Sequence, residues 1–149
     1  MDRMIIVQDE KMLEDYICPL PHFVRQFLRS QHENFAVIHP LANHIAPSAC
    51  MNGGTVLVRT IPSIDTPPIQ MSRHVIRLLG KPIFVTTCTI GEGVMPQNYE
   101  DIEDHVKTGV DHISPLTFGI DESAEFSTVI KYDHEGHITV VRNSGEKQY

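Results

Sequence analysis

The residues best suited to chemistry in this sequence are two arginines and several hydroxyl side chains at the ends of apolar runs. Arg59 follows Val56-Leu57-Val58, and Arg142 follows Val140-Val141. An arginine at a strand end offers a rigid fork of donors that suits phosphate or carboxylate oxygens. Hydroxyl groups can orient such oxygens without adding charge, and the sequence supplies them at Thr86, Thr87, Ser127 and Thr128.

A simpler interpretation stays open for each of these residues. Arg59 and Arg142 could end their strands with the guanidinium group in water or beside a surface acid. Ser127 and Thr128 are ordinary strand residues by propensity. The anion-binding hypothesis therefore depends on these side chains meeting at one place, as strand ends do in open α/β sheets.

Other chemistries have weaker support. Cys88 follows a predicted buried strand, where a free cysteine behaves as a small hydrophobe, and no histidine beside it in sequence suggests activation. His134 and His137 flank a turn with two acidic residues, but their spacing is not specific for a metal, so no metal site is predicted. The stretch 91–93, GEG, is too short for a phosphate-binding loop and is better interpreted as a turn.

Alternating patterns predict the elements that position these residues. Apolar runs predict strands at 4–7, 35–39, 55–60, 83–87 and 110–113. Amphipathic spacing predicts helices from Asp9 to about Ile17, over 23–28, over 70–79 and over 98–106. The stretches 127–132 and 137–142 alternate about a turn and predict a terminal β-hairpin. The fold class is α/β, with a twisted open mixed sheet and helices packed on it.

Composition narrows the class of protein further. The 149 residues fit one domain, 1–149. Three cysteines form no even framework or CxxC pair, so a reduced, cytoplasmic setting is expected. The apolar runs are far shorter than the roughly 20 residues of a membrane span, so no membrane partner is expected. A formal net charge of −7 disfavours broad attraction to nucleic acid, so any phosphate site must be a local patch.

Three stretches of the sequence, taken in order, form a set: 56–62 (VLVRTIP), 78–89 (LLGKPIFVTTCT), and 127–130 (STVI) with 140–145 (VVRNSG). They resemble three motifs of the YrdC-like (threonylcarbamoyl-AMP synthase) family. These motifs are an apolar strand ending in Val-Arg, a Gly-x-Pro strand leading into Thr-Ser-Ala-Asn, and a Ser-Thr-Val strand with a closing Leu-Arg-x-Gly. Their order and separations agree over roughly residues 50 to 145.

The resemblance implies a concave sheet that binds ATP, with Mg²⁺ held largely by the substrate phosphates, and no covalently bound cofactor. In the family this site makes threonylcarbamoyl-adenylate for tRNA modification, and the family is also associated with double-stranded RNA. Carried over by position, Arg59, Thr87, Ser127 and Arg142 are expected to contact the phosphates, the adenylate or the threonine. Thr86 and Thr128 would add neighbouring hydroxyls.

The sequence also departs from the family pattern. The family's N-terminal segment, with its Lys-x-Arg phosphate-binding pair, has no counterpart that can be placed here, and Thr89 replaces the asparagine of Thr-Ser-Ala-Asn. Gly91-Glu92 replaces the following Ser-Gly and brings an acid near an expected anion site. The sequence thus predicts nucleotide or RNA binding and leaves catalysis open. The alternative is a noncatalytic interaction module, such as a homodimer, that retains the fold.

Overall fold

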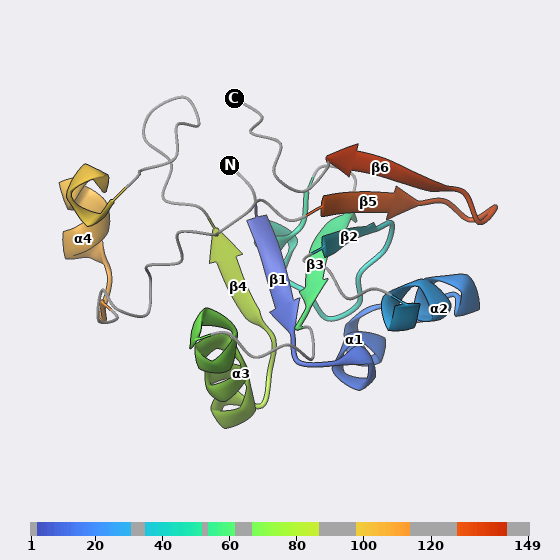
Figure 1. Cartoon of the computed structure of the whole chain (residues 1–149), viewed down its shortest axis with the longest axis horizontal. Coiled ribbons are helices and arrows are strands. Elements are labelled where there is room, and N and C mark those ends of the chain that lie inside the picture. The colour runs from blue at the N-terminus through green and yellow to red at the C-terminus, as the bar shows by residue number, and fades with distance from the viewer. Residues whose placement is uncertain are drawn as a thin grey trace.

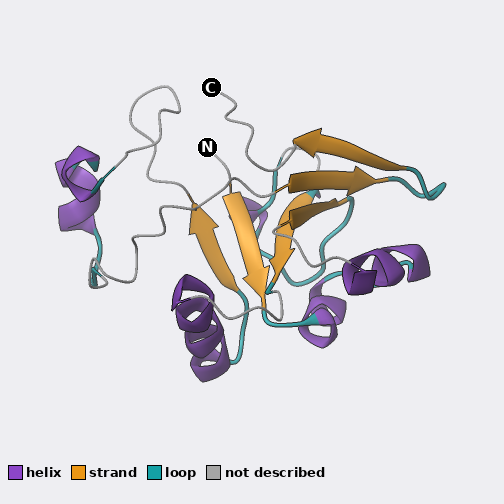
Figure 2. Ribbon diagram, viewed as in Figure 1, coloured by secondary structure: helices purple, strands orange, loops and turns teal. Residues whose placement is uncertain are grey.

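The described part of the chain is built around one six-stranded mixed sheet. The computed structural model describes residues 3–30, 35–51, 54–61, 67–86, 98–113 and 128–142. The strands lie in the order β4-β1-β3-β2-β5-β6, with helices beside the sheet (Figures 1 and 2). The strands are β1 (Arg3–Val7), β2 (Phe35–His39), β3 (Val56–Thr60), β4 (Ile83–Thr86), β5 (Thr128–Tyr132) and β6 (Ile138–Arg142). The helices are α1 (Glu10–Tyr16), α2 (His22–Ser30), α3 (Pro67–Leu79) and α4 (Asp104–Gly109), with 3₁₀ turns η1 (Pro47–Ala49) and η3 (Tyr99–Asp101).

Strand pairing is both parallel and antiparallel, as the sequence predicts. β1 pairs with β3, and β2 with β5, in parallel. The pairs β1–β4, β2–β3 and β5–β6 are antiparallel. In Figure 1 the strands β4 and β1 run in a different direction from β5 and β6, so the sheet is strongly twisted.

The N-terminal half folds where its sequence pattern places it. Asp9 caps α1, since its side chain accepts a hydrogen bond from the backbone N–H of Met12 at 2.8 Å. A network of ion pairs then joins α1 to α2. Arg25 pairs with both Glu10 and Glu14, and Arg29 pairs with Glu10 at 3.0 Å.

The two faces of the sheet carry separate hydrophobic clusters. The larger cluster packs α1 and α2 on the sheet, through the buried residues Ile5, Val7, Leu13, Ile17, Leu20, Val24, Val37, Val56, Val58, Ile130 and Tyr132. We call this the helix-covered face. The strand residues that alternate with this cluster lie on the opposite face of the sheet. There, Ala36, Leu57 and Val129 are buried beside Met4, Ile38 and Met51. Side chains alternate along each strand, so every strand residue belongs to one face or the other.

Helix α3 begins earlier than predicted. It starts at Pro67 rather than at residue 70, because proline is tolerated in the first turn of a helix, where its missing N–H has no intrahelical partner. It ends as predicted at Gly80, whose φ of +72° is the left-handed conformation typical of a residue that follows a helix. The N–H of Gly80 donates to the carbonyl of Ile76 at 2.8 Å.

The segment 98–113 differs from the prediction. In place of one helix over 98–106, the structure has η3, an extended Ile102, and the short helix α4. Neither element buries a residue, so no packing holds a continuous helix together. The strand predicted at 110–113 is also absent from this described segment, where Val110 and Ile113 are 47% and 46% exposed.

The terminal hairpin forms as predicted. β5 and β6 flank a turn in which the N–H of Asp133 donates to the carbonyl of His137 at 3.2 Å. Gly136 has a φ of +91°, which suits glycine at the left-handed position of such a turn. The predicted strand residue Ser127 lies outside the described residues.

Candidate functional site

Arg59 is the arginine that the sheet holds on the face opposite α1 and α2. It pairs with Ile6 on β1, while the preceding residue, Val58, belongs to the helix-covered face. Arg59 is half-buried, and burial lowers its pKa because desolvation disfavours the charged form. No residue in the described part of the chain forms a hydrogen bond or ion pair with its guanidinium group. The fold thus holds a cation partly out of water without a described counter-ion.

Arg142 lies in the same transverse row of the sheet as Arg59. The antiparallel register of β2 and β3, continued by one residue, places Ala36 beside Arg59. Ala36 pairs with Val129, and Val129 pairs with the backbone of Arg142. Three strand spacings separate the two arginine backbones, which is about 14 Å. Two residues far apart in sequence therefore occupy one line across the sheet.

The hydroxyl residues are not brought together with this row. Thr86 pairs with Arg3, and Thr128 pairs with Phe35. Both positions alternate onto the face opposite Arg59. Thr87 and Ser127 lie outside the described residues. Among the described candidates, the structure aligns the two arginine positions and separates them from the two threonines.

The surroundings of Arg59 are apolar. Ile6 on the neighbouring strand is 7% exposed, and Leu57, two residues before Arg59 on the same face, is 6% exposed. A charge in such surroundings interacts more strongly with an opposite charge than it would in water. Binding sites for small molecules commonly combine an apolar lining with a few polar groups that fix orientation. The half-buried Arg59 therefore lies among apolar residues that are themselves buried.

A buried polar pair on the helix-covered face was missed by sequence reasoning. His39 is 1% exposed, and its Nδ1 lies 2.8 Å from the hydroxyl oxygen of Tyr132. Burial lowers the pKa of His39 to about 4 and raises the pKa of Tyr132 to about 12, so both side chains stay neutral at neutral pH. Phe23 packs edge-on against Tyr132. The sequence did carry a signal for this pair, because His39 and Tyr132 each stand at the end of an apolar run that predicts a strand.

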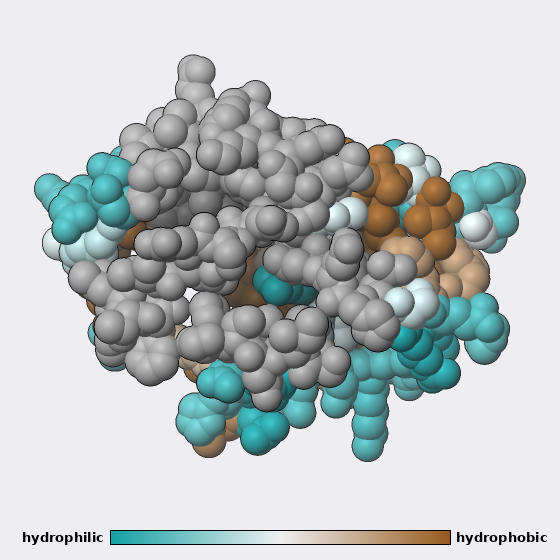
Figure 3. Space-filling model, in the orientation of Figure 1, coloured by the Kyte–Doolittle hydropathy of each residue, from teal (hydrophilic) through white to brown (hydrophobic). Residues whose placement is uncertain are grey.

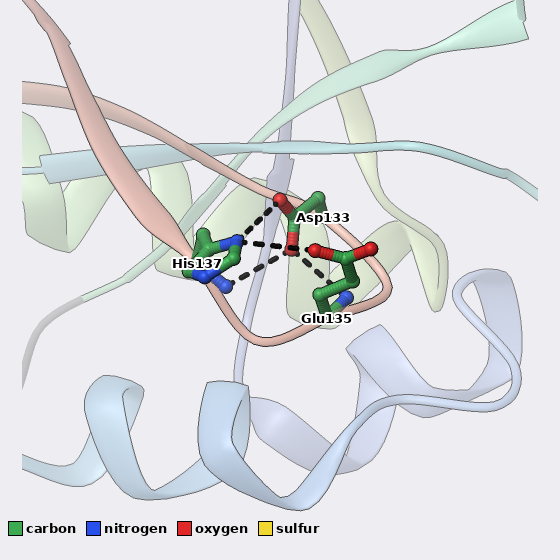
Figure 4. Close-up of side chains that lie close together, drawn as sticks. All are labelled: Asp133, Glu135 and His137. Atoms are coloured by element: carbon green, nitrogen blue, oxygen red, sulfur yellow. Dashed lines mark hydrogen bonds and ion pairs between the residues drawn. The ribbon is translucent and has the colours of Figure 1, made fainter.

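The turn between β5 and β6 gathers three side chains that could bind a metal (Figure 4): Asp133, Glu135 and His137. All three are exposed. Hydrogen bonds within the turn account for the grouping, because one carboxylate oxygen of Asp133 accepts from the N–H of Glu135 at 2.9 Å and from that of His137 at 3.0 Å. The bond from the His137 N–H is also the main cause that lowers the pKa of Asp133. The turn's own structure thus explains why these residues meet.

The remaining sequence candidates add little. Cys18 is an exposed free cysteine and Cys50 is a half-buried one. Cys88 and the stretch 91–93 lie outside the described residues. Within the described residues, no helix is long and apolar enough to cross a membrane.

The described elements define an α/β protein with a YrdC-like sheet. The chain is similar to the crystal structure of E. coli YciO, a YrdC-family protein, with a TM-score of 0.65. The match covers 97% of this chain and 67% of that chain, so this chain spans about two thirds of the length of YciO. The two sequences are 20% identical, and the likeness therefore establishes the fold. No family model and no curated protein sequence matches the chain.

Proposed function

We propose that this protein binds the phosphate groups of a nucleotide, with ATP as the leading ligand, at the row that contains Arg59 and Arg142. The observation that carries the proposal is the half-buried guanidinium group of Arg59, which has no hydrogen-bond or ion-pair partner among the described residues. Burying a charge without a partner is costly. A phosphate would supply the missing partner through two parallel N–H···O bonds.

Charge and surroundings support the choice of a nucleotide. A chain with a formal net charge of −7 repels anions in general, so it needs local cations at a phosphate site. Two arginine positions in one row supply them. The apolar residues beside Arg59 are buried, and such surroundings strengthen the attraction between its guanidinium group and a phosphate. The YrdC-like fold is consistent with this ligand class.

Synthesis of threonylcarbamoyl-adenylate is not part of the proposal. Binding of a nucleotide does not by itself establish a reaction, and the likeness to YciO, at 20% sequence identity, establishes only the fold. Nucleotide binding needs only the arginine row, and Mg²⁺ would be held mainly by the phosphates of ATP. Duplex RNA carries the same phosphate chemistry and is the second ligand to test.

Calorimetric titration with MgATP, threonine and short duplex RNA tests the proposal. We expect Arg59→Ala to weaken MgATP binding by roughly 10- to 100-fold, since a hydrogen bond to a charged group is worth about 1.5–3 kcal/mol. Arg59→Lys should recover only part of the loss, because lysine lacks the planar fork. Arg77→Ala is the matched control, since it removes an exposed arginine on α3. This variant should bind MgATP as the wild type does.

Two results would contradict the proposal. One is the absence of binding to any of these ligands at millimolar concentration. The other is MgATP binding that Arg59→Ala leaves unchanged. The second candidate function, a protein-interaction module, is favoured by a different observation, namely the apolar residues exposed along β6 at the edge of the sheet.

A further inference from the structure

Strand β6 is an edge of the sheet and exposes apolar side chains. It is the last strand in the sheet order. Ile138 is 41% exposed and Val140 is 54% exposed. Both lie on the helix-covered face, since they pair with Tyr132 and Ile130. Figure 3 shows hydrophobic residues gathered over the β5–β6 ribbon. Such an edge is a template for pairing with another strand.

The register of the hairpin decides which backbone groups of β6 face outward. Pairs in an antiparallel ladder alternate between bonded and non-bonded. Asp133 and His137 are a bonded pair, because the N–H of Asp133 donates to the carbonyl of His137. The next pair, Tyr132 with Ile138, is therefore non-bonded, and so is Ile130 with Val140. The N–H and C=O groups of Ile138 and Val140 thus point away from β5, toward the edge of the sheet that no described strand covers.

We propose that β6 pairs antiparallel with β6 of a second copy of this chain, about a two-fold axis at Thr139. Ile138 then lies opposite Val140 of the partner subunit, and Val140 opposite Ile138 of the partner subunit. Each of these two pairs exchanges two N–H···O bonds, which satisfies all four outward groups of each strand. A two-fold axis makes the contact self-complementary, so the assembly closes as a dimer.

Charge complementarity selects a second copy in this orientation. The register of β6 shifts by one residue between Val140 and Arg142, and beyond this shift the strand end that carries Arg142 runs toward the turn of the partner subunit that carries Asp133 and Glu135. The basic end of each strand therefore meets the acidic turn of the other copy. A parallel arrangement would instead bring like charges together. Between Ile138 and Val141 the strand also has no lysine or proline, the residues that commonly protect an edge.

The dimer should be weak, since five residues a side bury less surface than a stable interface of standard size. Sedimentation of the full chain from micromolar to submillimolar concentration should show a monomer–dimer equilibrium. Val140→Lys should weaken the dimer at least about tenfold, because a charge on the edge must be desolvated beside apolar groups. Phe84→Lys is the matched control, since Phe84 is 50% exposed on β4 at the opposite edge of the sheet. It should leave the dimer unchanged.

Cross-linking tests the register itself. In a background with Cys18, Cys50 and Cys88 changed to serine, Thr139→Cys should form a disulfide-linked dimer under mild oxidation, because the axis places the two residues in a non-bonded pair about 4.5 Å apart. Val141→Cys is the control. Val141 lies two residues from the axis and is 44% exposed. In the proposed register it does not lie opposite the partner subunit's Val141.

A monomer at submillimolar concentration would overturn the proposal. A dimer that Val140→Lys leaves intact, or equal cross-linking of the two cysteine variants, would do the same. The inference does not depend on nucleotide binding. Arg59→Ala should keep the dimer, and Val140→Lys should keep MgATP binding, so failure of one proposal is distinguishable from failure of the other.

Discussion

The two faces of the sheet hold polar side chains in different ways. On the helix-covered face, His39 is almost completely shielded from solvent and lies in hydrogen-bonding contact with Tyr132. On the opposite face, Arg59 is half-buried, and no described residue pairs with it. Both side chains are desolvated, and burial lowers the pKa of each. Burying a charged side chain costs free energy, and only the histidine avoids this cost, because it becomes neutral at ordinary pH.

The difference separates a structural polar group from one that is available to a ligand. The fold provides His39 with a partner that comes from its own sheet, and this pair joins the ends of β2 and β5. Arg59 stays charged and receives no such partner within the described residues. The helix-covered face should therefore dominate stability, and the arginine row should matter for binding. Three experiments can break or sharpen this comparison.

The largest effect is expected from His39. Its folded-state pKa of about 4 lies below the ordinary 6.5, so between these values the unfolded chain binds more protons than the folded chain does. The stabilisation is complete above pH 6.5 and is lost as the pH falls toward 4. Between pH 7 and pH 4 the wild type should lose roughly 3 kcal/mol of unfolding free energy through this group.

Urea denaturation at both pH values measures this loss, with His39→Asn as the comparison. Asparagine can keep a hydrogen bond to Tyr132 but does not titrate. Carboxylates contribute equally to the acid sensitivity of both proteins, so the difference between them isolates His39. Equal losses in the wild type and the variant would show that His39 is not held neutral by burial.

A smaller effect of opposite sign is expected from Arg59→Met. Methionine keeps much of the apolar stem and removes a partly desolvated charge, so the unfolding free energy should rise by roughly 1 kcal/mol or less. MgATP binding should fall at the same time. Thermal or urea denaturation beside calorimetry measures both. A clear loss of stability would indicate that Arg59 is a structural residue like His39.

The smallest effect is expected from Glu10→Gln. This change cuts the ion pairs from Arg25 and Arg29 that join α2 to α1. Exposed ion pairs contribute about 0–1 kcal/mol and weaken with salt. Urea denaturation should therefore show a loss below about 1 kcal/mol that shrinks further at high salt. A loss that is large and independent of salt would mean that Glu10 supports the helix-covered face by packing.

Local patterns predicted most of the elements correctly. Alternating apolar residues placed β1, β2, β3 and β5, because their inward side chains do pack in the core. The same patterns placed β4 and β6, although none of the side chains described on these two strands is buried, so the expectation that β4 is a buried strand was wrong. Asp9 and Gly80 marked helix ends because each satisfies backbone groups there. The prediction was wrong over 98–113, where Tyr99 and Ile102 repeat a helical pattern but find no core to bury them. Periodicity indicates which side could be buried, and only packing decides whether it is.

The candidate site was less accessible to sequence reasoning. The sequence could nominate Arg59, Thr86, Thr128 and Arg142 by residue type, but not their faces. Strand order and register decided that the two arginines share a row and that the two threonines lie on the other face. A shift of one residue in any pairing would reverse that outcome, because side chains alternate with a period of two.

The sequence by itself determined the α/β class, the helix caps and the hairpin with its turn, since these depend on residues close together in the chain. The tertiary structure decided which distant strands are neighbours. It therefore decided that Arg59 has no partner among the described residues, whereas His39 lies in hydrogen-bonding contact with Tyr132 on the other face. It also decided that Ile138 and Val140 turn their backbone groups toward an edge that no described strand covers. These outcomes depend on contacts between remote segments, whose register no local pattern encodes.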